Sequence, residues 1–118
     1  MKFGTIRLDG SARLVMQTDD GGICPIEKVM AMTGRDLPVT MLDLVTRAGS
    51  DAGLLPALAA DIKAMPADSI IRQDDNTDWL PPIGNPSKIL GVAFNNRELM
   101  KKAHHDPGVP NFFLKPPS

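Results

Sequence analysis

His104, His105 and Asp106 form the only local group in the sequence whose residue types match those of metal ligands. A metal site needs three or four donors that converge on one point, whereas side chains adjacent in a chain diverge. Histidines at the end of a helix also lie favourably beside its last carbonyl groups. We therefore interpret these residues as a polar helix end, with a metal site as the alternative.

Two pairs of aspartates could in principle supply catalytic carboxylates, Asp19 with Asp20 and Asp74 with Asp75. Both pairs lie in stretches typical of turns, so solvated turns are the favoured interpretation. The sequence contains no P-loop, G-x-G-x-x-G, G-x-S-x-G or H-E-x-x-H motif. The residues alone thus give no support to phosphate, dinucleotide, serine-hydrolase or zincin chemistry.

The composition is that of an ordinary globular protein. The chain has 118 residues, of which 42% are hydrophobic and 23% charged. A net charge of -1 and a pI near 6.0 favour neither nucleic acid nor anionic lipid as a partner. Cys24 is the only cysteine, which excludes an intramolecular disulfide and suits a reducing compartment. No stretch approaches the roughly 20 apolar residues of a membrane span, so we expect a cytoplasmic protein.

The first third of the sequence predicts a hairpin followed by a short strand and a helix. Residues 3–8 and 11–17 favour extended structure, and Asp9-Gly10 between them is a two-residue hairpin turn. The side chains of residues 11–17 alternate between a more apolar and a more polar face, as expected of a strand with one buried side. A third strand at 23–24 leads through Pro25 into a helix that ends near Gly34.

Two further helices are expected before Pro66. Thr40 with Asp43 resembles a capping box and opens a helix in which Leu42 and Val45 should face inward, with Met41 as a third candidate. The next helix begins near Leu54 and carries an apolar stripe, which we interpret as core packing. The members of that stripe are Leu54, Leu58, Ile62 and Met65.

The remaining sequence predicts a linker and then a strand-helix-strand. Residues 66–86 are rich in proline and turn formers. Residues 88–94 are almost continuously apolar and predict a strand covered on both faces, followed by a helix over 97–103 and a strand over 111–115. The fold class is therefore α/β (α+β), with a small domain at 1–65, a linker at 66–86 and the start of a second domain at 87–118.

Two runs in the last third resemble the fumarylacetoacetate hydrolase family. They are residues 81–95, PPIGNPSKILGVAFN, and residues 110–118, PNFFLKPPS. In that family a proline-rich linker leads into an apolar strand that ends in Asn, and a Phe-Leu-Lys-Pro segment opens the catalytic core. The order and spacing of these segments in this chain agree with the family pattern. Residues 1–65 resemble the family's amino-terminal domain more loosely.

The resemblance implies the amino-terminal part of a cytoplasmic, metal-dependent hydrolase or lyase that acts on carbon–carbon bonds of β-diketo or oxo acids. The parent enzyme would be a homodimer and would bind Mg²⁺ or Mn²⁺ through a Glu-x-Glu pair and a later Asp. No such set follows Lys115 in this sequence. We therefore expect the 118 residues alone to be inactive and without a metal, with Asn95 and Lys115 as the substrate-binding candidates.

The sequence departs from the family pattern at the general base. Where many members have Asn-Tyr and then Asp-His, this chain has Asn95-Asn96 and then Glu98-Leu99. His104 or His105 would have to replace the missing histidine from the end of the helix. The alternative function, from a different class, is a short binding or adaptor module that keeps the family's fold elements without the chemistry.

Overall fold

The computed structural model describes residues 1–93, 95–104, 108–109, 111–116 of the chain. The chain divides into two compact units, Met1–Gly84 and Asn85–Ser118. We call them unit 1 and unit 2. In the described residues, no helix is long and apolar enough to cross a membrane.

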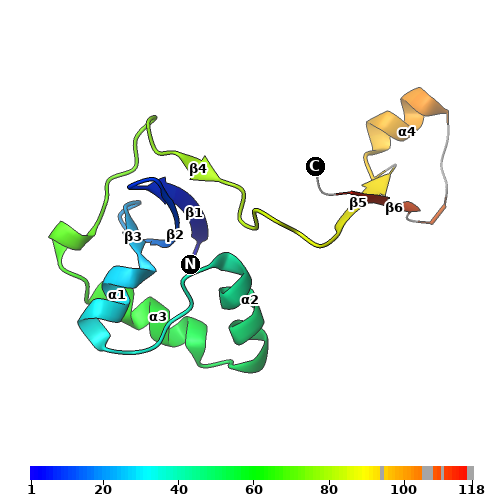
Figure 1. Cartoon of the computed structure of the whole chain (residues 1–118). Helices are drawn as coiled ribbons and strands as arrows, with labels where there is room; N and C mark the ends of the chain where they lie inside the picture. The colour runs from blue at the N-terminus through cyan, green and yellow to red at the C-terminus, as the bar shows by residue number, and fades with distance from the viewer. Residues whose placement is uncertain (94, 105–107, 110, 117–118) are drawn as a thin grey trace. The chain divides into compact units, whose positions relative to one another are not determined.

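Unit 1 contains a four-stranded antiparallel sheet (Figure 1). Its strands are β1 (Phe3–Leu8), β2 (Ser11–Gln17), β3 (Ile23–Pro25) and β4 (Trp79–Leu80), in the spatial order β3-β2-β1-β4. The predicted hairpin between β1 and β2 is confirmed, with Leu8 opposite Ser11. Its turn residues Asp9 and Gly10 both have positive φ, 50° and 77°, as a tight two-residue turn requires.

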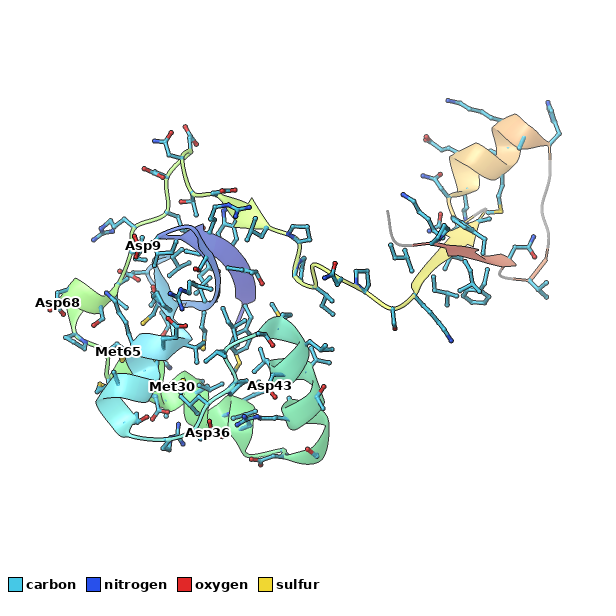
Figure 2. All side chains as sticks on the ribbon, in the orientation of Figure 1. Asp9, Met30, Asp36, Asp43, Met65 and Asp68 are labelled. Atoms are coloured by element: carbon cyan, nitrogen blue, oxygen red, sulfur yellow. The ribbon has the colours of Figure 1, made fainter. Side chains whose placement is uncertain are left out.

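Three α-helices and a 3-10 turn complete unit 1: α1 (Ile26–Thr33), α2 (Met41–Ser50), α3 (Leu54–Lys63) and η1 (Ala67–Ser69). The predicted cap of α2 is present, because the hydroxyl of Thr40 accepts a hydrogen bond of 3.1 Å from the backbone N–H of Asp43. Gly34 ends α1 in the left-handed conformation with φ 68°. Arg47 of α2 then bonds both Asp36 and Asp43, labelled in Figure 2, which fastens the preceding loop to the helix.

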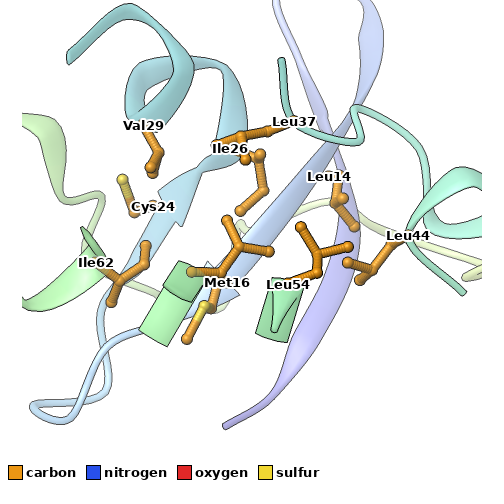
Figure 3. Close-up of a cluster of buried hydrophobic side chains, with 10 residues drawn as sticks. Leu14, Met16, Cys24, Ile26, Val29, Leu37, Leu44, Leu54 and Ile62 are labelled. Carbon is orange, nitrogen blue, oxygen red and sulfur yellow. The ribbon is translucent and has the colours of Figure 1, made fainter. Parts of the chain in front are cut away.

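The main core lies between one face of the sheet and the three α-helices (Figure 3). Its buried residues are Leu14, Met16, Cys24, Ile26, Val29, Leu37, Leu44, Leu54, Leu58 and Ile62. A second, smaller cluster of Ile6, Val15 and Ile23 lies on the other face, with Leu8 and Ile71 packed against it. The expectation that β2 buries only one side was therefore wrong, since residues from the segment before β4 help to cover its second side.

Helix α2 presents a different face to the core from the one expected. Leu44 is only 3% exposed, whereas Leu42 is 59% and Val45 58% exposed. The prediction that Leu42 and Val45 face inward was wrong. The cap at Thr40 sets where the helix begins, but the rotation of the helix about its axis is set by what it packs against.

Much of the stretch predicted to be a linker belongs to unit 1. Ile71 exchanges two backbone hydrogen bonds with Ile23, of 2.8 and 2.9 Å. The backbone N–H of Arg7 donates to the carbonyl of Asp78 at 2.9 Å, and β4 pairs with β1. The division between the units falls at Gly84 and Asn85, inside the proline-rich run 81–86.

Unit 2 consists of β5 (Ile89–Ala93), α4 (Arg97–Ala103) and β6 (Asn111–Lys115). The two strands are antiparallel, with Leu90 opposite Leu114 and Val92 opposite Phe112. The side chain of Asn96 accepts from the N–H of Glu98 at 2.8 Å and caps α4. Together with unit 1, these elements confirm the mixed α+β fold class.

Candidate functional site

The candidate substrate-binding residues Asn95 and Lys115 lie near opposite ends of the β5–β6 pair. Lys115 is opposite Ile89, and Asn95 follows the other end of the ladder, at Ala93. The four residue steps from Ile89 to Ala93 span about 13 Å. Both side chains are exposed. Unit 2 by itself therefore does not bring Asn95 and Lys115 to a common point.

His104 lies directly after α4 and is exposed, with its backbone N–H bonded to the carbonyl of Lys101 at 3.3 Å. Its φ of 48° is unusual for a residue other than glycine. His105 and Asp106 fall outside the described residues, as does the side chain of Leu99. In the part of the chain that the structure describes, no group of three His, Cys, Asp or Glu residues could hold a metal ion.

Cys24 is fully buried in the main core (Figure 3). Burial disfavours the thiolate and raises the pKa of the thiol. Its Sγ lies 3.6 Å from the carbonyl oxygen of Pro25. A buried thiol with a raised pKa is not an activated nucleophile, so Cys24 serves packing.

One face of the β5–β6 pair is apolar and open, and we call it the apolar ladder face. It consists of Leu90, Val92, Phe112 and Leu114, which alternate along their strands and pair across them. These residues are 63%, 41%, 61% and 67% exposed, respectively. The sequence predicted that β5 would be covered on both faces. Among the described residues of unit 2, none covers the ladder face, because a single pair of strands cannot supply a second layer.

The structure also forms a hollow in unit 1 that sequence reasoning did not find, and we call it the turn pocket. Its volume is about 490 Å³, and it lies between the β2–β3 turn, the end of α3 and the segment through η1. Ile62, Met65 and Ile70 supply its apolar lining, and Figure 2 labels Met65 just before the segment that carries Asp68. Its charged lining residues are Asp19, Asp20, Lys63 and Arg72.

Hydrogen bonds within the β2–β3 turn favour the charged form of Asp20. The hydroxyl of Thr18 donates to Oδ1 of Asp20, and the backbone N–H of Gly22 donates to the same oxygen at 3.4 Å. These two bonds, the first being the stronger cause, lower the pKa of Asp20. Lys63 Nζ lies 3.6 Å from Oδ2 of Asp19. The sequence signal for this arrangement is the Asp19-Asp20 pair, whose pattern by itself indicates only a solvated turn.

No family model matches this chain, and no curated protein matches it.

Proposed function

We propose that the chain is the amino-terminal part of a metal-dependent hydrolase or lyase of the fumarylacetoacetate hydrolase family, which cleaves carbon–carbon bonds of β-diketo or oxo acids. The observation that carries the proposal is the order of elements after the proline-rich run. That run leads into β5 and α4, and the Phe113-Leu114-Lys115-Pro116 segment forms the end of β6 and the residue after it. The elements coincide with the two sequence runs that resemble the family.

Unit 1 suits the role of a lid, a scaffold or a dimer contact in such an enzyme. It has a core of its own, and the 3-10 turn, the Ile23–Ile71 bridge and β4 fasten the stretch 67–80 to its sheet. A unit with its own core can support a catalytic domain without supplying catalytic residues. The proposal includes a cytoplasmic location and a homodimeric parent.

The apolar ladder face supports the same proposal from unit 2. Four exposed apolar side chains on one sheet face are costly in water and favour cover by another layer of structure. In the parent enzyme, further strands or helices of the catalytic domain would provide that layer. They would also bring other groups toward Asn95, Lys115, His104 and His105, which are the proposed contacts to substrate and the proposed bases.

The described residues do not fit the metal that the proposal implies. Mg²⁺ and Mn²⁺ prefer carboxylate and water oxygens, and the described chain offers no converging set of them. Under the proposal, the ligands are a Glu-x-Glu pair and a later Asp of the parent enzyme.

The proposal is tested by reading the coding sequence after the Ser118 codon and expressing the protein that it specifies. We expect a Glu-x-Glu pair, a later Asp, and Mg²⁺-dependent hydrolysis of an acylpyruvate by the longer protein. The 118-residue chain should show no turnover above a reaction without enzyme. Lys115→Gln should raise KM or lower kcat of the longer protein, whereas Lys102→Gln on α4 serves as the matched control. A reading frame without those carboxylates, or turnover by the short chain, would contradict the proposal.

The second candidate is a short, non-catalytic binding or adaptor module. The apolar ladder face favours it too, because exposed apolar patches rimmed by polar residues are common at protein interfaces. The two candidate functions predict different coding sequences after the Ser118 codon. A stop codon there, together with a chain that fails to turn over any acylpyruvate, would favour the adaptor.

A further inference from the structure

The β2–β3 turn gives the turn pocket a fixed polar side. The backbone N–H of Thr18 donates to the carbonyl of Gly22 at 2.9 Å, and that of Gly21 donates to the carbonyl of Thr18 at 3.1 Å. Gly21 has a φ of 87°, which a side chain would make strained. Thr18 and Gly22 both donate to Oδ1 of Asp20, and the backbone N–H of Asp20 itself makes a weaker contribution to its lowered pKa. Oδ2, which the Thr18 and Gly22 bonds leave unused, is the oxygen that we assign to a ligand.

Arg72 supplies the opposite charge to the same pocket. The backbone bonds between Ile71 and Ile23 fix the chain immediately before Arg72 beside β3. Among the described residues, the Arg72 guanidinium has no hydrogen-bond partner, although its charge acts on Asp20. A planar guanidinium with free donors is suited to bind a carboxylate through two parallel bonds.

The four charges that line the pocket sum to zero, and two of them form a solvent-exposed ion pair. Lys63 and Asp19 form an ion pair of 3.6 Å. Asp20 and Arg72 remain, with opposite signs, as the groups that can bind a ligand. A purely anionic or purely cationic ligand would meet one attractive and one repulsive charge, whereas a ligand with both charges meets two attractive ones.

Apart from Thr18 and Gly22, the uncharged residues that line the pocket are apolar. Ile62 is 5% exposed and forms part of the main core, while Met65 and Ile70 are half-buried and line the pocket beside it. Methionine adapts its shape to the apolar groups that it contacts. A volume of about 490 Å³ lies within the range of roughly 300–1,000 Å³ that is typical of small-molecule sites.

We propose that the turn pocket binds a free α-amino acid with a flexible apolar side chain. The ligand carboxylate binds Arg72, its ammonium group binds Oδ2 of Asp20, and its side chain packs against Met65 and Ile70. This site is independent of the proposed hydrolase function. It uses residues of unit 1 alone.

The test titrates the isotopically labelled 118-residue chain with L-leucine and follows its backbone amide signals by NMR. Two analogues serve as probes of the charges: 4-methylpentanoate, which lacks the ammonium group, and 3-methylbutylamine, which lacks the carboxylate. We expect saturable shifts at residues 18–22 and 70–72 with leucine, and at least about tenfold weaker binding of each analogue. The absence of saturable shifts, or equal binding of leucine and either analogue, would overturn the proposal.

Single substitutions separate the two contacts. Arg72→Gln and Asp20→Asn should each weaken leucine binding by about tenfold or more, because each removes one charge-assisted bond. Lys28→Gln, at an exposed cation of α1 that does not line the pocket, is the matched control and should leave the affinity unchanged. Unchanged affinity in Arg72→Gln, or an equal loss in Lys28→Gln, would refute the assignment. The amide signals of the main core report in the same spectra that each variant is folded.

Discussion

Leu44 and Leu42 of α2 offer a matched pair, because the same substitution two residues apart should have different costs. Truncation to alanine removes three carbons, each worth about 0.8 kcal/mol when fully buried, or about 2.4 kcal/mol in total. Leu44 is 3% exposed, so Leu44→Ala should cost this amount and a cavity term, about 3 to 4 kcal/mol. Leu42 is 59% exposed, so Leu42→Ala should cost about 1 kcal/mol or less, partly offset by the helix propensity of alanine.

Both variants are measured by thermal and urea unfolding, followed by far-UV circular dichroism and by the fluorescence of Trp79. Trp79 is the only tryptophan and belongs to β4 of unit 1. For a domain of this size, each kcal/mol lowers Tm by about 4–8 °C. We therefore expect Leu44→Ala to lower Tm by at least about 12 °C, and Leu42→Ala by no more than about 8 °C. If Leu42→Ala costs as much as Leu44→Ala, Leu42 is buried to a similar extent, which would contradict the exposure of Leu42 in the structure.

Three further predictions concern the cap, the thiol and the ladder face. Thr40→Ala should lower the free energy of unfolding by about 1 kcal/mol through loss of the α2 cap, whereas Thr40→Ser should keep the cap and nearly the full stability. Equal urea midpoints for the wild type and both variants would contradict this. Cys24 should react with a thiol reagent only as unit 1 unfolds, and rapid labelling of the native chain would refute this. Because the pKa of Cys24 is raised in the folded state, its contribution to the free energy of unfolding should be full below the ordinary thiol pKa and should fall as pH rises above that value. We expect the 118-residue chain to self-associate through the apolar ladder face, and Phe112→Ser combined with Leu114→Ser should reduce this association in analytical ultracentrifugation. Unchanged association in the double variant would show that the apolar ladder face is not responsible.

The sequence by itself determined the features that depend on neighbouring residues. The Asp9-Gly10 turn, the Thr40 cap and the end of α1 at Gly34 were all readable, because turn and cap geometry depends on a few adjacent side chains. The bounds of α4 at Arg97–Ala103 and of β6 at Asn111–Lys115 were predicted for the same reason. The stripe of α3 was also readable, since Leu54, Leu58 and Ile62 are buried at helical spacing.

Tertiary structure decided the features that join distant parts of the chain. The rotation of α2 is set by its packing partners, so Leu44 rather than Leu42 reaches the core. The second buried side of β2 depends on Ile71, and the turn pocket joins residues 18–22 to residues 62–72. Local patterns carry no information about such pairings, because the side chains concerned are separated by about 40 to 60 residues and meet only when the sheet and α3 have formed.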